Sequence, residues 1–201
     1  MSHLPPIRNR HWIEYAATVL VLVISMILLW LATGTENANR RMVAAASWPF
    51  PQLDSSNSDQ QDQTHSMLPI ANSGVGPAKA ESFEVVWNGK AYTTSQSYLE
   101  QCCGYRGYSF PLKPDEPRRT PVVTGTITGA VIRAGETRPF LSMRLGADNE
   151  AVWKALDDAR FKSRFRICYR SVFDECWLSN LDGLHPARVD RCPVPKVPYI
   201  E

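Results

Sequence analysis

The most apolar part of the chain is residues 15–33, which contain no charged residue, no proline and no glycine. An α-helix of this length rises about 30 Å, the thickness of the hydrocarbon core of a bilayer. Lipid offers no hydrogen-bond partners to the backbone, so such a segment must be helical. Trp12, Tyr15 and Trp30 flank it as interfacial aromatic residues do. The pattern predicts a single membrane-spanning helix.

The length of this stretch also distinguishes an anchor from a cleaved signal peptide. The apolar region of a signal peptide has only roughly 7–15 residues. A longer run favours an uncleaved anchor, although the small residues at 44–46 would suit a peptidase. Residues 1–14 then form a short tail that carries Arg8 and Arg10.

A polar stretch follows the apolar one. Residues 54–65 contain no apolar side chain. Such a segment cannot bury enough surface to offset the entropy of ordering it. We therefore expect residues 34–80 to be a flexible polar linker and residues 81–201 to be the globular domain.

Alternation of apolar and polar positions predicts strands in this domain. Residues 83–87 and 90–93 flank Asn88-Gly89, the pair that favours a two-residue hairpin turn. Residues 122–132 and 138–145 have strand character. Helices are predicted at residues 95–101 and 149–159, the second with Asp148 as N-cap and a Glu150–Lys154 pair.

The most regular alternation lies in residues 160–170. Its apolar positions are Phe161, Phe165, Ile167 and Tyr169, and the alternate positions carry cations: Arg160, Lys162, Arg164, Arg166 and Arg170. A period of two places the two sets on opposite faces of a strand. Residues 176–179 return beside it as a hairpin.

These elements predict an α+β fold. We expect one small antiparallel sheet of about five strands, packed by one main helix, and either an NTF2-like or an OB-like arrangement fits. The membrane helix and the linker precede it.

The cysteines bear on location. All five lie in the C-terminal half of the chain: Cys102, Cys103, Cys168, Cys176 and Cys192. A small cysteine-rich domain is typical of an oxidising compartment. The basic residues around the anchor do not decide its orientation, because Arg40 and Arg41 follow it as Arg8 and Arg10 precede it. We therefore expect an inner-membrane protein with a cytoplasmic tail and a periplasmic (or equivalent luminal) domain.

A hairpin centred on Val172 would place Cys168 opposite Cys176, within reach of a disulfide. Cys192 would then pair with Cys102 or Cys103, and one thiol would remain.

Candidate chemistry is sparse. The chain has no Cys-x-x-Cys, no Gly-x-Ser-x-Gly and no phosphate-binding loop, and His185 is the only histidine after residue 80. We predict no catalytic residue, metal or cofactor. A net charge of +2 gives no general attraction to nucleic acid. The alternative is a thiol-active or hydrolytic enzyme that uses Cys102 or Cys103 with His185.

The leading interpretation is a membrane-anchored binding, scaffold or accessory subunit whose exported domain engages a protein partner or an anionic surface. Two regions are candidate binding surfaces: the five cations of residues 160–170, and the loop that carries Tyr105 and Tyr108. The competing interpretation of the cations is a solvated face neutralised by neighbouring acids such as Asp174, Glu175 and Asp182.

Overall fold

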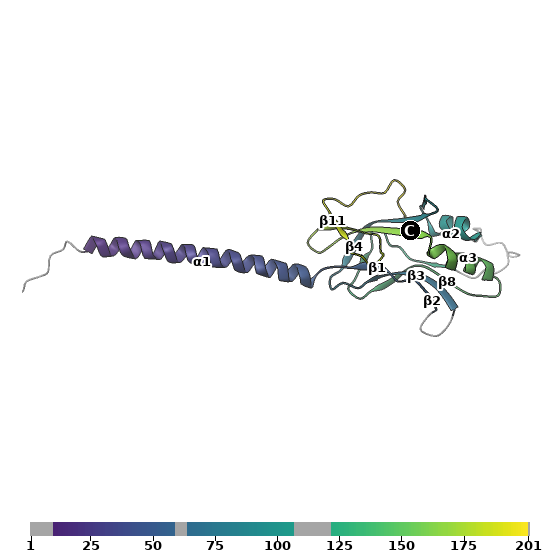
Figure 1. The fold of residues 1–201 in the computed structure, drawn as a ribbon, viewed down its shortest axis with the longest axis horizontal. Coiled ribbons are helices and arrows are strands. Elements are labelled where there is room, and N and C mark those ends of the chain that lie inside the picture. Colours follow the sequence, from purple (N-terminus) through teal and green to yellow (C-terminus); the bar gives the residue numbers. More distant parts are fainter. Residues whose placement is uncertain (1–9, 59–63, 107–121, 201) are drawn as a thin grey trace, which may run out of the picture. The chain divides into compact units, whose positions relative to one another are not determined.

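The computed structural model of the protein describes residues 10–58, 64–106 and 122–200, and the chain divides into two compact units at Ala45/Ala46 (Figure 1). The N-terminal unit is the helix α1 (Arg10–Ala46). In the described part of the chain, α1 is the one helix long and apolar enough to cross a membrane. The hydroxyls of Thr18 and Ser25 donate to the carbonyls of Glu14 and Val21, so these polar groups are satisfied within the helix.

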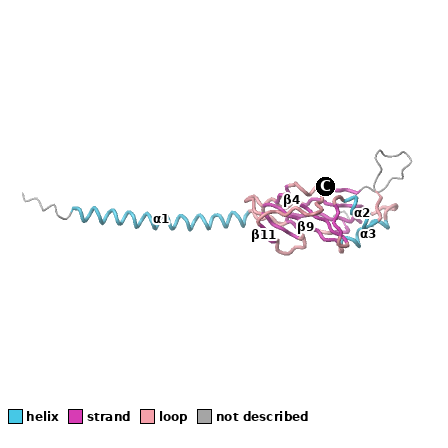
Figure 2. The backbone as a smooth tube through the Cα atoms, turned by 90° about the horizontal axis from the view of Figure 1, so that it is seen from above, coloured by secondary structure: helices cyan, strands magenta, loops and turns pink. Residues whose placement is uncertain are grey.

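The C-terminal unit contains two antiparallel sheets and two helices, and Figure 2 shows the helices together at one end of the sheets. The first sheet has the order β1-β3-β8-β6, with β2 also paired to β3; its strands are β1 (Pro51–Leu53), β2 (Ser56–Ser58), β3 (Thr64–Asn72), β6 (Val122–Thr124) and β8 (Thr137–Arg144). The second sheet has the order β11-β10-β9-β4-β5, with β7 also paired to β4; its strands are β4 (Ala78–Trp87), β5 (Lys90–Tyr92), β7 (Val131–Ile132), β9 (Ser163–Arg170), β10 (Cys176–Ser179) and β11 (Ala187–Val189). The helices are α2 (Ser95–Cys103) and α3 (Glu150–Arg160).

The α+β class is confirmed, but the strands are more numerous than the five expected and form two sheets. Three of the additional strands, β1–β3, come from residues 51–72, inside the expected linker. Leu68 and Ile70 of β3 are fully buried. The folded domain therefore begins near residue 46 and not at residue 81, and residues 64–80 are not a linker.

Aromatic side chains from both sheets form the centre of the core. The Phe83 ring of β4 packs 5.1 Å from that of Phe140 in β8 and 5.4 Å from that of Tyr199 near the C-terminus, measured between ring centroids. Phe165 of β9 stacks on Phe83. Burial of these rings joins the two sheets, since each aromatic residue removes a large apolar area from water.

Local sequence signals locate several elements correctly. Asn88 and Gly89 have positive φ and connect β4 to β5 as the predicted hairpin. The Glu150–Lys154 ion pair of α3 is present, with 2.6 Å between Oε1 and Nζ. The helix begins one residue later than predicted, because Asn149 and not Asp148 is the N-cap. The side-chain amide of Asn149 accepts from the Gly146 amide and donates to the Arg144 carbonyl.

The segment Ser47–Phe50, here called the junction segment, is held against the turn that connects β3 to β4. The amides of Val75 and Gly76 both donate to the Trp48 carbonyl. A Cβ atom on Gly76 would overlap the Ser47 carbonyl, so only glycine fits there. The start of the domain is thus fixed by backbone contact.

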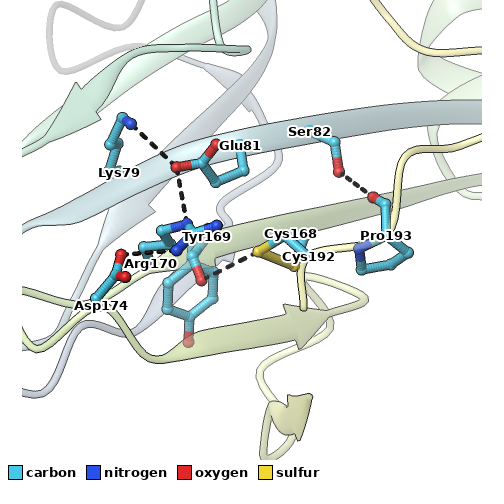
Figure 3. The surroundings of a disulfide bond; sticks show 9 residues. All are labelled: Lys79, Glu81, Ser82, Cys168, Tyr169, Arg170, Asp174, Cys192 and Pro193. Atoms are coloured by element: carbon cyan, nitrogen blue, oxygen red, sulfur yellow. Dashed lines mark hydrogen bonds and ion pairs between the residues drawn. A yellow bond between two sulfur atoms is a disulfide. The ribbon is translucent and has the colours of Figure 1, made fainter. Parts of the chain in front are cut away.

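Residues 190–200, here called the C-terminal strap, run from β9 to the edge of β4, which Tyr199 meets between the segments paired with β7 and β5. The strap is tied to β9 by a disulfide at Cys192, and the Ser82 hydroxyl donates to the Pro193 carbonyl (Figure 3). At its end the Tyr199 amide donates to the Phe83 carbonyl, and the Tyr199 side chain is fully buried. The strap is thus attached to both β9 and β4 of the second sheet.

Candidate functional site: an open strand edge lined by arginines

The candidate site lies where β10 separates from β9. The register pairs these strands from Arg170↔Cys176 to Ile167↔Ser179, and β10 ends there. Leu181 then adopts a left-handed conformation with φ 59°, and its carbonyl accepts a hydrogen bond from the Leu53 amide of β1. Within residues 10–58, 64–106 and 122–200, this bend leaves residues 163–166 of β9 without a neighbouring strand on that side.

The space left by the bend is a groove of about 620 Å³. This β9 groove lies within the roughly 300–1,000 Å³ typical of ligand sites. Its lining combines apolar side chains with three arginines and two acids: Leu53, Glu84, Val86, Arg160, Ser163, Arg164, Phe165, Arg166, Asn180, Leu181 and Asp182.

The three arginines of the groove differ in their partners. Arg166 donates to the Glu84 carboxylate at 2.6 Å, across the β4–β9 ladder. Arg164 is exposed and has no ion pair in the described ranges. A guanidinium that is exposed and unpaired is free to bind an anionic group.

Arg160 is the buried member of the set. Its side chain is only 8% exposed, and its Nε lies 2.9 Å from an Asp157 carboxylate oxygen. That contact is too poorly aligned to be a hydrogen bond, because both atoms are buried without a hydrogen-bond partner. A terminal nitrogen reaches the Ser55 hydroxyl at 3.4 Å.

The structure divides the five predicted cations. It brings Arg160, Arg164 and Arg166 together at the groove, and Arg160 ends α3 instead of beginning the strand. Lys162 is exposed in the turn between α3 and β9 and does not line the groove.

Arg170 lies at the opposite end of β9, between Glu81 and Asp174 (Figure 3). Its hydrogen bond to Asp174, with the charges of Asp174 and Glu81, raises the pKa of the Arg170 guanidinium. The charge at this end of the strand is therefore neutralised. Glu81 pairs with Arg170 and Glu84 with Arg166, the role that was predicted for Glu175 and Asp182. Both glutamates belong to β4, and no signal in the sequence fixes the register that places them beside β9.

The loop that follows α2 is only partly described. Tyr105 is half-buried and packs against the core, and its amide donates to the Leu99 carbonyl at the end of α2. Its backbone and ring thus have a structural role. Tyr108 lies outside the described residues.

The predicted Cys168–Cys176 pairing is wrong. Cys168 is bonded to Cys192, with 5.6 Å between the Cα atoms (Figure 3). Cys102 is bonded to its neighbour Cys103. Cys176 is a buried free thiol. The hairpin centres on Phe173 and not on Val172, so Cys176 faces Arg170 while Cys168 faces Leu178. Because the turn is centred one residue later than predicted, the residue opposite Cys168 lies two residues later, at Leu178 instead of Cys176.

The structure does not provide the free thiol that the alternative, an enzyme using Cys102 or Cys103 with His185, requires. Cys102 and Cys103 are joined to each other, and His185 is exposed with no hydrogen bond or ion pair in the described part of the chain. The described residues contain no group of three metal-ligating side chains close enough to hold an ion.

Sequence reasoning missed a contact between His65 and Ser142, because residue 65 was assigned to the linker. The Ser142 hydroxyl and His65 Nε2 are hydrogen-bonded between β8 and β3. Ser142 is buried, so this contact serves the first sheet.

No protein-family model, curated protein or solved structure matches this chain.

Proposed function

We propose that this protein is a membrane-anchored binding subunit whose folded domain engages a protein partner through the β9 groove. The observation that carries the proposal is the exposed Arg164, which has no ion pair among the described residues, in a groove that also contains Arg160 and Arg166. Arginine is enriched where proteins recognise one another, since its fork of donors suits carboxylates. Leu53, Val86 and Leu181, which also line the groove, add apolar surface for burial.

The location is part of the same proposal. The helix α1 is long and apolar enough to anchor the chain, and two disulfides suit an oxidising compartment. The domain accordingly lies in the periplasm or an equivalent lumen, and the basic tail lies in the cytoplasm. The partner is then a protein of the same membrane or of that compartment.

A pull-down from native membranes tests the binding role. The double variant Arg164→Glu/Arg166→Glu should recover markedly less partner than the unmodified chain, because both substitutions place like charges against an acidic surface. Arg188→Glu is the matched control, since Arg188 is an exposed cation on β11, outside the groove. Equal recovery by all three proteins would remove the groove from the account.

A further inference from the structure

The direction of the backbone groups along β9 defines what the groove can bind. In an antiparallel strand the N–H and C=O of one residue point to the same side, and the side alternates along the strand. The Phe83 carbonyl of β4 accepts from the Tyr199 amide on the far edge of β4, away from β9. Phe83 lies opposite Ile167, so Ile167 directs its own backbone groups toward β10.

The same alternation carries into the open stretch of β9. Phe165, two residues before Ile167, directs its N–H and C=O to the same side, where β10 no longer reaches. No described residue supplies a hydrogen bond to either group on that side. The groove therefore contains a ready backbone donor and acceptor, an arrangement that pairs readily with another strand.

We propose that residues 163–166 of β9 bind an extended acidic segment of the partner protein as an added strand. The inference rests on the proposed function and names the mode of binding. Added strands gain affinity from backbone hydrogen bonds and specificity from alternate side chains. The residue opposite Phe165 is apolar, because it faces Leu53 and Leu181, and the residues on either side are acidic, because they face Arg164 and Arg166.

Charge decides against a second copy of this chain as the occupant. Two β9 edges paired antiparallel would place arginines beside arginines, and like charges opposite one another destabilise a strand pair. An acidic segment meets Arg164, which is exposed and has no ion pair in the described residues. The recognised pattern is acid–apolar–acid.

The test uses the full chain in nanodiscs of zwitterionic lipid and a labelled synthetic peptide of alternating glutamate and valine. We expect the peptide to bind and to slow hydrogen exchange at the Phe165 amide. Arg164→Glu/Arg166→Glu should weaken binding by about tenfold or more, and Arg188→Glu should not. A peptide of equal charge, in which the valine amides that would pair with β9 are N-methylated, should bind far less tightly, because it lacks those hydrogen-bond donors.

Each other outcome overturns the inference. Equal binding of the methylated peptide would show a purely electrostatic contact and leave the proposed function standing. If the peptide fails to bind while the pull-down still recovers a partner in a manner that depends on Arg164, strand addition is rejected and the proposed function stands. Preferential binding to anionic vesicles, or a dimer that the double variant dissociates, would replace the acidic segment by a lipid surface or a second copy.

Discussion

Asn72 shows how one buried side chain fixes the start of the domain. Its amide oxygen accepts from the backbone amides of Phe50 and Gly74, and its amide nitrogen donates to the carbonyls of Gly76 and Ile132. These four bonds use the whole capacity of the side chain. They connect the junction segment, the β3–β4 turn and β7.

Replacement of Asn72 by alanine should therefore be costly. Asn72→Ala leaves backbone donors and acceptors without partners in a buried place, so the free energy of unfolding should fall by about 2–4 kcal/mol. Urea unfolding of the two proteins measures this difference. Asn57→Ala, at an exposed position of β2, is the control and should change stability by less than about 0.5 kcal/mol. Equal losses of stability in Asn72→Ala and Asn57→Ala would contradict this structural role of Asn72.

Tyr98 of α2 should make the domain less stable as the pH rises in the alkaline range. Burial raises the pKa of its phenol to about 12, and the hydrogen bond with Ser163 only partly opposes this. The folded pKa lies above the unfolded value of about 10, so ionisation favours unfolding. The contribution is complete below pH of about 10 and is lost as pH rises toward about 12.

The unmodified protein should therefore lose up to about 3 kcal/mol of stability from this group across that range. Tyr98→Phe should show a shallower fall when denaturant unfolding is compared at several alkaline pH values. Some fall should remain, since burial also raises the pKa of Tyr169. Identical slopes in the two proteins would show that Tyr98 ionises freely in the folded state.

The sequence was informative about single residues where alternation is local. Arg164 and Arg166 were placed correctly on one face of a strand, because a period of two needs no distant partner. Glu84, Leu53 and Leu181 could not be found, since their place in the groove depends on strand register and on the bend after Ser179. Those features depend on contacts between distant parts of the chain.

At the scale of elements, the C-terminal strap is an irregular segment that no helix or strand pattern in the sequence predicts. Its prolines suppress any periodicity, yet Tyr199 packs on Phe83 and Phe140, and the Thr128 hydroxyl donates to the Tyr199 carbonyl. The β4–β5 hairpin, by contrast, was predictable because its turn is two adjacent residues. The alternation of β3 is hidden because its buried face mixes polar and apolar residues: Ser66, Leu68, Ile70 and Asn72.

Removal of the Tyr199 side chain should open a cavity in the core. We expect Tyr199→Ala to lower the free energy of unfolding by about 3–5 kcal/mol, as for other large buried aromatic residues. Ile200→Ala is the matched control, because Ile200 is the next residue and is exposed. Chemical unfolding of both variants checks the result. A Tyr199→Ala protein as stable as the control would show that the strap is not part of the core.

At the scale of the whole molecule, the cysteines report the compartment of the domain. Mass mapping without reduction, on protein from its native membrane, should find Cys102–Cys103, Cys168–Cys192 and free Cys176. Exported proteins keep disulfides, whereas cytosolic thiols stay reduced. Five free thiols would place the domain in the cytoplasm, and a Cys168–Cys176 bond would contradict the register of β9 and β10.

The most direct test of the binding role is crosslinking in the native membrane from the groove itself. A photoreactive residue in place of Asn180, an exposed residue of the groove lining, leaves all three arginines in place. In the full chain it should capture a distinct protein in the compartment of the domain. The same residue in place of Arg188 should not, because Arg188 lies outside the groove. The adduct should disappear when the alternating glutamate–valine peptide is added. The same pattern of adducts from both positions, or no adduct from position 180, would contradict a binding subunit that works through the β9 groove.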